Sequence, residues 1–212
     1  MNDAVLAVSL GATAVGFVFT PSRRSVSTEF AAGVGKVLPK VARRIGVVVN
    51  PSLDEAVAIA DAALLTDLQF HGHESPVFLA QLRALRPDLG ILKALDVDES
   101  LSVAKIETYS QAADVLLFDA PRTSSPRKAL DISLLKTVLE SSKVGLKFWI
   151  AGGVRFWIAG GLNAQNVAEH VVKLRPSGVD VASAVEDASG FKSEHAMRNF
   201  IAAAIGAFHE RN

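Results

Sequence analysis

The sequence contains no cysteine. This absence excludes disulfides, cysteine metal sites and a cysteine nucleophile, and it suits a reducing compartment. The chain also has no excess of either charge, because 22 basic residues balance 22 acidic ones. A balanced charge gives no electrostatic reason to expect binding to nucleic acid or to an acidic membrane surface.

The five histidines form no metal-binding pattern. No His-Glu-x-x-His pair is present, and His71 with His73 alone would make a poor metal site. We therefore predict no metal site.

One uncharged stretch, residues 4–22, is long enough to suggest a membrane span or a signal peptide. However, the start Met1-Asn2-Asp3 carries no positive charge, and Gly11-Ala12-Thr13 interrupts the apolar run. A helix, a turn and a strand explain the stretch better. We expect a soluble, cytoplasmic protein that does not associate with membranes.

Half of the 212 residues are hydrophobic, which is enough for a large core. Apolar runs of strand length alternate with helical patterns, as in a parallel sheet joined by right-handed crossovers. The predicted strands lie at 14–19, 45–50, 68–70, 91–95, 115–118, 156–159 and 179–182. The predicted helices cover 2–10, 76–85, 100–109, 130–139 and 193–208, and three more begin near Ser27, Ser52 and Asn163.

The chain begins with a helix, residues 2–10, and not with the strand that should precede it. Eight strand–helix units close a barrel, so seven strands behind an orphan helix indicate a barrel without its first strand. We predict one α/β domain over residues 1–212, a (βα)8 TIM barrel truncated at its N-terminus. In the first helix we expect Ala4, Val5, Ala7 and Val8 to face inward.

A buried strand that runs into two glycines lies near the C-terminal end of the chain, at 156–161. Glycine lets a ligand approach the backbone, and the N–H groups at a helix start attract anions. Gly160 and Gly161 therefore predict half of a phosphate site, with an ordinary strand-to-helix turn as the alternative. We expect Asn163 to cap the following helix, whose buried face would carry Val167, Val171 and Val172.

The same strand has a near copy. Residues 148–153 read Phe-Trp-Ile-Ala-Gly-Gly, and 156–161 repeat these letters eight residues later. Only the second copy leads into a helix start, so we assign the strand to it. The first copy is then an insertion in the preceding crossover, or a competitor for the same strand position.

Ligands of parallel barrels lie over the carboxyl ends of the strands. Asp119 ends an apolar strand, where an acid is costly to bury and well placed to act on a ligand. Residues 183–186 would complete the phosphate site, because the last two strands of many barrels bind one phosphate together. The other polar residues at strand ends have simpler explanations as solvated or structural groups: Arg23, Arg24, Asn50, Gln69, His71 and Lys93.

Six ordered motifs resemble the phosphoribosylanthranilate isomerase family. They are Gly16-Phe-Val-Phe with Ser22-Arg-Arg-Ser-Val-Ser, Gly46-Val-Val-Val-Asn, Leu68-Gln-Phe-His-Gly, Leu116-Leu-Phe-Asp, Ile158-Ala-Gly-Gly-Leu-Asn and Gly178-Val-Asp-Val-Ala-Ser-Ala-Val-Glu. The resemblance implies a ribulose-phosphate-binding barrel of tryptophan biosynthesis. Its reaction would be the Amadori rearrangement of N-(5-phosphoribosyl)anthranilate to 1-(2-carboxyphenylamino)-1-deoxyribulose 5-phosphate, without cofactor or metal.

The resemblance also implies roles for individual residues. Asp119 matches the general acid that protonates the ribose ring oxygen and opens the ring to a Schiff base. Arg24 matches the arginine that holds the anthranilate carboxylate. The phosphate-binding turns correspond to Gly160, Gly161, Ser183 and Ala184, and the polar floor of the site to Gln69 and His71. The only expected partners are this small phosphorylated aminosugar and, in a homodimer, a second copy; otherwise the chain is a monomer.

Three departures from the family affect the expected activity. The family opens with a strand reading Lys-Ile-Cys-Gly, whose cysteine is the general base, and this chain lacks both. Residues 121–128 replace a glycine-rich loop, and Ala184 replaces a glycine. We therefore expect impaired isomerase activity, with a non-catalytic barrel that only binds a phosphorylated sugar as the alternative. A sister barrel acting on another aminoaldose ranks lower, because its first-strand aspartate is missing too.

Overall fold

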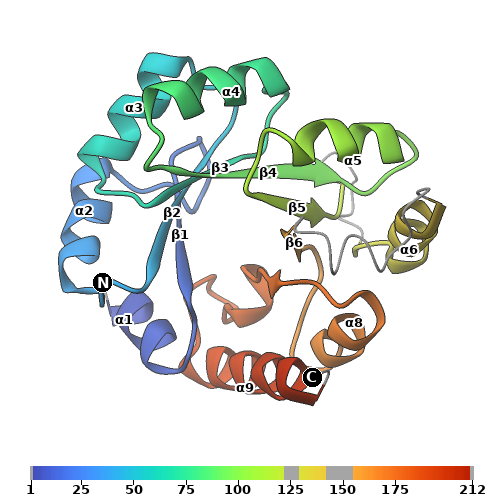
Figure 1. The fold of residues 1–212 in the computed structure, drawn as a ribbon. Helices are drawn as coiled ribbons and strands as arrows, with labels where there is room; N and C mark the ends of the chain where they lie inside the picture. The colour runs from blue at the N-terminus through green and yellow to red at the C-terminus, as the bar shows by residue number, and fades with distance from the viewer. Residues whose placement is uncertain (1, 122–128, 142–154, 211–212) are drawn as a thin grey trace. The chain divides into compact units, whose positions relative to one another are not determined.

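The computed structural model describes residues 2–121, 129–141 and 155–210. Strands and helices alternate along these residues (Figure 1). The chain divides into two units, of which the first comprises Met1–Ala94 with Gln111–Asp114. The second comprises Leu95–Ser110 with Val115–Asn212. Each unit is described in turn.

The first unit contains a parallel sheet whose strands follow one another in chain order. Its strands are β1 (Ala14–Val18), β2 (Arg43–Val48), β3 (Asp67–Phe70) and the beginning of β4 (Gly90–Asp96). All four residues of β3 are buried, because neighbouring strands pair with it on both sides. The parallel α/β prediction is confirmed here.

Serine side chains begin three helices of this unit. Helix α2 (Thr28–Val37), α3 (Leu53–Ala62) and α4 (Pro76–Leu85) follow the N-caps Ser27, Ser52 and Ser75. In α3 the predicted start is confirmed as a capping box, because Ser52 and Glu55 each accept the other's backbone N–H. Figure 1 shows α2, α3 and α4 along the outer side of the strands that they connect.

Helix α1 (Asn2–Ser9) packs along β1 and buries no residue fully. Ala4, Ala7 and Val8 are half-buried, whereas Val5 is 42% exposed, so the expectation that Val5 faces inward is wrong. Leu6 takes its place among the half-buried positions. A period of 3.6 residues places Ala4, Ala7 and Val8 on one side of the helix and Val5 at the edge of that side.

The second unit also carries parallel strands, β5 (Val115–Asp119), β6 (Arg155–Ile158) and β7 (Gly178–Val179). Strand β6 comes from the second copy of the repeat, as predicted, while the first copy at 148–153 lies outside the described residues. The helices are α5 (Val103–Ser110), α6 (Ile132–Ser141), α8 (Val167–Leu174) and α9 (Glu194–Glu210), with a 3₁₀ turn, η1 (Ser183–Val185).

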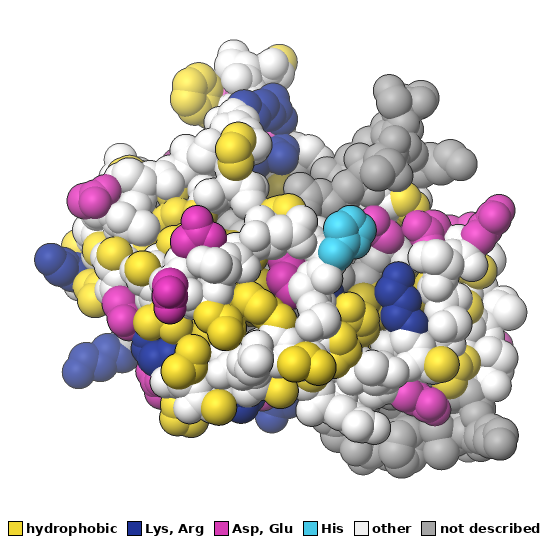
Figure 2. All heavy atoms as spheres, turned by 90° about the horizontal axis from the view of Figure 1, so that it is seen from above, with side chains coloured by type: hydrophobic (Ala, Val, Ile, Leu, Met, Phe, Trp, Pro, Cys, Tyr) yellow, Lys and Arg dark blue, Asp and Glu magenta, His cyan; other side chains and the backbone are white. Residues whose placement is uncertain are grey.

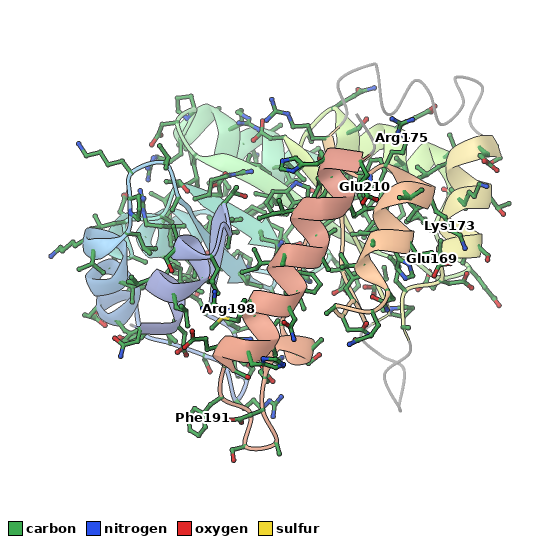
Figure 3. All side chains as sticks on the ribbon, turned by 90° about the horizontal axis from the view of Figure 1, so that it is seen from below. Glu169, Lys173, Arg175, Phe191, Arg198 and Glu210 are labelled. Atoms are coloured by element: carbon green, nitrogen blue, oxygen red, sulfur yellow. The ribbon has the colours of Figure 1, made fainter. Side chains whose placement is uncertain are left out.

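Helices α8 and α9 lie side by side (Figures 1 and 3). The outer side of α8 carries Glu169 and Lys173, whose ion pair is 2.6 Å long, and both side chains are largely exposed. Such exposed pairs one helical turn apart stabilise a helix by only about 0.3–0.5 kcal/mol. Burial of apolar side chains, including Val171 and Leu174 on α8 and Phe200 on α9, therefore dominates this layer.

Strand β7 is shorter than predicted. It covers two residues and not 179–182, because its partner β6 ends at Ile158, which pairs with Val179. Gly178 pairs with Trp157, and a Cβ at Gly178 would lie 2.6 Å from the indole nitrogen of Trp157. The missing side chain therefore provides the space that the indole ring occupies.

Two expectations about α8 are also wrong. Asn163 does not cap the helix: its Oδ1 accepts the N–H groups of Gln165 and Asn166 at 2.9 and 3.0 Å, and Asn166 is the N-cap. Val172 is 55% exposed, whereas Leu174 is buried. A helical period of 3.6 residues places Leu174, and not Val172, on the face of Val171.

Charge on the surface is mixed. Figure 2 shows acidic, basic and hydrophobic side chains interspersed on one face, in agreement with the formal net charge of zero. Within 2–121, 129–141 and 155–210, no helix has both the length and the apolar character that crossing a membrane would require.

Candidate functional site

A cavity of about 270 Å³ opens where the three strands of the second unit end. It is lined by Asp119 after β5, by the turn Ala159–Leu162 after β6 and by Asp180–Ser183 after β7. Four predicted site residues thus line one cavity: Asp119, Gly160, Gly161 and Ser183. Ala129, at the start of the segment before α6, completes the described lining.

The two glycines adopt a conformation that other residues rarely enter. Their φ angles are +90° at Gly160 and +73° at Gly161. Hydrogen bonds hold both of their carbonyl groups. Leu130 N–H donates to Gly160 O at 3.1 Å, and Asn166 Nδ2 donates to Gly161 O at 3.0 Å. The conformation of the turn is therefore stabilised through its carbonyl oxygens, and at both glycines the turn lines the cavity with backbone alone.

Asp119 lies directly beside this turn. It is the last residue of β5 and only 4% exposed, and its carbonyl accepts the Val97 N–H at 2.9 Å. A Cβ at Gly160 would stand 2.7 Å from Asp119 Oδ1. Because Gly160 has no side chain, the carboxylate of Asp119 can occupy this position in the lining of the cavity.

A second carboxylate in the lining was not predicted. Asp180 follows β7, where its N–H donates to Ile158 O at 2.9 Å, and it is half-buried. The predicted strand at 179–182 includes Asp180, whereas β7 ends at Val179 and leaves Asp180 at the strand end. The available signal was the one used for Asp119, an acid next to apolar strand residues.

The turn after β7 is also held by local bonds. Ser183 begins η1 and lines the cavity, whereas Ala184 is exposed and is not among the described lining residues. Lys192 Nζ donates to Ala182 O at 2.7 Å and pairs with Glu186 at 3.2 Å. The loop beyond carries Phe191, which is 73% exposed and projects away from α9 (Figure 3).

Three other predicted site residues belong to the first unit. Gln69 is buried in β3, and its Oε1 lies 2.9 Å from Nε2 of His71, which is half-buried at the end of that strand. The two side chains contact each other, in addition to any backbone groups that they satisfy. Arg24 is half-buried in the loop after β1, where its N–H donates to Ser22 Oγ at 3.1 Å.

Lys93, for which the sequence favoured a structural explanation, has a charged partner. Its Nζ lies 3.0 Å from Oε2 of Glu74, and both side chains are 2% exposed. Glu74 was not predicted, because nothing in its local sequence distinguishes it from a solvated loop residue. The pair is the most deeply buried ion pair in the described part of the chain.

Comparison with known proteins identifies the family. The model of N-(5'-phosphoribosyl)anthranilate (PRA) isomerase matches residues 1–203. An N-(5'-phosphoribosyl)anthranilate isomerase from Rubrobacter xylanophilus is 35% identical over 211 residues, which cover 96% of this chain and 94% of the relative.

Solved structures agree with this. The crystal structure of phosphoribosyl anthranilate isomerase from Thermus thermophilus superposes with a TM-score of 0.79 at 31% identity, covering 97% of this chain and 94% of the other. A phosphoribosyl anthranilate isomerase in complex with reduced 1-(o-carboxyphenylamino)-1-deoxyribulose 5-phosphate gives a TM-score of 0.76 at 29% identity, covering 97% and 93%. The predicted fold class, a (βα)8-type barrel with one strand missing, is consistent with these relatives.

The predicted resemblance is therefore confirmed, and the chain belongs to the family of N-(5'-phosphoribosyl)anthranilate isomerases, enzymes of tryptophan biosynthesis.

Proposed function

We propose that the cavity of the second unit binds the phosphate of N-(5'-phosphoribosyl)anthranilate, the substrate of this family. One observation carries the proposal: a single cavity combines a two-glycine turn, a serine-led 3₁₀ turn and a buried aspartate. Backbone N–H groups in such turns suit a phosphate dianion, and the final strands of barrels commonly supply them. The ligand of a solved relative, the reduced deoxyribulose 5-phosphate, carries the same phosphate group.

Asp119 is the proposed general acid. It would give its proton to the ribose ring oxygen as the bond from that oxygen to C1 breaks, leaving a Schiff base with the anthranilate nitrogen. A general base, which is a cysteine in the family, would take the C2 proton to give the enaminol. Addition of a proton to C1 and loss of the proton of the C2 hydroxyl then give the ketone of the product. The position of Asp119 beside Gly160, in the lining of the same cavity, supports this proposed role.

For three residues of the first unit we propose the roles that the family resemblance implies. Arg24 would hold the anthranilate carboxylate, because a planar guanidinium can donate two parallel hydrogen bonds to it. Gln69 and His71, which contact each other, would provide polar groups for the sugar hydroxyls. For Ala184 we propose at most a backbone contact, because the described cavity lining includes Ser183 and not Ala184.

The proposed activity of the chain is low. The family's general base is a cysteine, and this sequence has none. Loss of a general base typically lowers a rate by about 10²–10⁴-fold. The absence of cysteine favours a second candidate function for the chain as given, which is binding of the phosphorylated aminosugar with little or no turnover.

Two measurements separate these functions. Calorimetry with the reduced deoxyribulose phosphate should detect binding, and inorganic phosphate should compete with it. A tryptophan auxotroph lacking the isomerase should not regain its normal growth rate with this chain. Failure to bind the analogue would overturn the proposed ligand, and normal growth would overturn the proposed low activity.

A matched pair of extended chains tests the role of the base. An N-terminal strand containing Lys-Ile-Cys-Gly, placed ahead of Asn2, should restore growth of the auxotroph. The same strand with Ala in place of Cys should restore binding alone. Equal growth with both extensions would show that the cysteine is not the missing group.

We further propose that the protein acts in the cytoplasm, as a monomer or as a homodimer. Phosphorylated sugars carry charge and do not diffuse through bilayers, so an enzyme that uses them must share their compartment. Cell fractionation and sedimentation velocity test the location and the assembly state.

A further inference from the structure

The buried pair of Lys93 and Glu74 has no place in the chemistry proposed above. Removing two charges from water costs several kcal/mol, and hydrophobic residues of similar volume often fill the same space at equal or greater stability. A pair with 2% exposure on both sides is therefore poorly explained by core packing alone. The groups around the pair indicate its role.

Both charged groups bond to the backbone of one turn. Lys93 Nζ donates to Phe70 O at 3.1 Å and to Gly72 O at 2.8 Å. The carboxylate of Glu74 accepts the Gly72 N–H at 3.2 and 3.1 Å through its two oxygens. The ammonium thus donates to the carbonyl groups of Phe70 and Gly72, while the carboxylate accepts an amide N–H of the same turn.

Glu74 also ties this turn to the neighbouring strand end. Its Oε1 accepts the N–H of Asn50 at 2.7 Å, and Asn50 holds the unusual φ of +48°. Asn50 Oδ1 in turn accepts the His73 N–H at 2.7 Å. A Cβ at Gly72 would collide with both Asn50 Oδ1 and Glu74 Oε1, so the loops after β2 and β3 meet without spare room.

Two of the proposed substrate-binding residues lie at the end of β3 and at the start of this turn. Gln69 immediately precedes Phe70, and His71 follows it, with their side chains 2.9 Å apart. The His71 N–H donates to Val48 O at 3.0 Å, so β2 fixes the amide side of this residue. Lys93 and Glu74 fix the carbonyl groups and the amide on either side of it.

We propose that Lys93 and Glu74 are positioning residues, which hold the turn after β3 so that Gln69 and His71 keep the orientation needed for the sugar. This inference rests on the proposed function. The pair acts through the backbone of Phe70 and Gly72.

A second ion pair of the same unit provides a matched control. Arg43 and Asp67 are the first residues of β2 and β3, at the ends of these strands away from the turn after β3. Arg43 Nε lies 3.0 Å from Asp67 Oδ2, and Thr66 Oγ1 donates to the same oxygen at 2.6 Å. Asp67 is buried, with 5% of its side chain exposed. Loss of this pair should lower stability without reorienting the turn after β3.

The experiment compares Lys93→Met and Glu74→Gln with the control Arg43→Met. Misplacement of a site group by about 1 Å can lower a rate by about 10²-fold. We expect each test variant to bind the reduced deoxyribulose phosphate at least about tenfold more weakly. Arg43→Met should unfold at lower urea concentration and keep the affinity within about twofold, because its pair lies away from the turn.

The NMR signals of the His71 ring supply a readout that needs no ligand. Comparison with His71→Asn assigns the ring, and both test variants should change its chemical shifts and tautomer, while Arg43→Met should not. Glu74→Gln keeps the size of the side chain and serves if Lys93→Met does not fold.

The outcomes are distinct. Folded test variants with the affinity and His71 ring signals of the unmodified chain would overturn the positioning role. If the unmodified chain does not bind the analogue, the proposed function fails, but the ring signals still decide whether the pair positions His71.

Discussion

The carboxylate of Asp119 and the backbone of Gly160 share a space that a single methyl group would fill. A Cβ at Gly160 would lie 2.7 Å from Asp119 Oδ1 and 2.5 Å from the Cβ of Ala120. The proposed acid and the proposed phosphate turn are therefore coupled sterically, although 41 positions (160 − 119) separate them in the sequence. A side chain added at Gly160 must therefore shift the carboxylate of Asp119 or the turn itself.

Gly160→Ala should disturb both stability and binding. The residue holds φ at +90°, which L side chains rarely adopt, and the new methyl group would displace Asp119 or Ala120. We expect a loss of about 1–3 kcal/mol in the free energy of unfolding and weaker binding of the reduced deoxyribulose phosphate. Urea unfolding and calorimetry measure the two effects.

Gly206→Ala is the matched control in the same unit. Gly206 lies in α9, and a Cβ there would meet nothing within 4 Å. Alanine in a helix is favoured over glycine by about 0.5–1 kcal/mol, so this variant should gain stability and bind normally. Equal behaviour of the two variants would contradict the proposed coupling.

Asp119→Asn separates binding from proton transfer. The amide keeps the size of the buried carboxyl group but cannot serve as the acid. In the chain extended by the cysteine-containing strand, we expect the initial isomerisation rate to fall by about 10²–10⁴-fold. Calorimetry should meanwhile show that the analogue still binds. An unchanged rate would remove Asp119 from the mechanism.

The capping box of α3 should make stability depend on acidic pH. Hydrogen bonds from the backbone and the hydroxyl of Ser52 hold the pKa of Glu55 below its ordinary value of 4.5. Because the folded pKa is lower, this contribution is complete above pH 4.5 and is lost as the pH falls through the folded pKa. Urea unfolding of Glu55→Gln should show a deficit at neutral pH that shrinks in acid.

The hydroxyl of Ser52 contributes in a second way, because it also accepts the Glu55 N–H at 3.2 Å. Ser52→Ala should lower the free energy of unfolding by about 1 kcal/mol. A deficit for Glu55→Gln that stays constant from neutral to acidic pH would contradict the assignment.

His170 on α8 should produce a second, separate pH dependence. Burial lowers its pKa below the ordinary value of 6.5, and its buried Nδ1 has no hydrogen-bond partner among the described residues. The unfolded chain therefore binds the proton more tightly, so stability falls as the pH drops below 6.5. His170→Leu should flatten this part of the curve in thermal unfolding, and an unchanged slope would exclude His170 as its source.

Hydrophobic patterns were sufficient to locate the seven strands found in the described part of the chain. Their ends were less predictable, because a strand ends where its neighbour ends. Arg43 belongs to β2 because Ala14 pairs with it, although Arg43 is not an apolar residue. In the same way, β7 ends with Val179 because β6 ends with Ile158.

Site residues could be predicted where a single residue type at a strand end indicated a function by itself. Gly160, Gly161 and Asp119 each stand out locally, as glycines or an acid at the end of an apolar strand. Glu74 does not, because its role depends on Lys93, 19 positions away (93 − 74) and on another strand. The exposure of Ala184 likewise follows from the 3₁₀ turn and not from its own chemistry.

The contact between Gly178 and Trp157 provides an intrinsic fluorescence probe. The indole of Trp157 lies against this glycine, between the ends of β6 and β7 that border the cavity. The sequence has only two tryptophans, so Trp149→Phe would leave Trp157 as the single long-wavelength emitter. Its fluorescence would then report on the packing of β7 against β6. A ligand that brings the turns after β6 and β7 closer together would change the wavelength or the intensity of the emission.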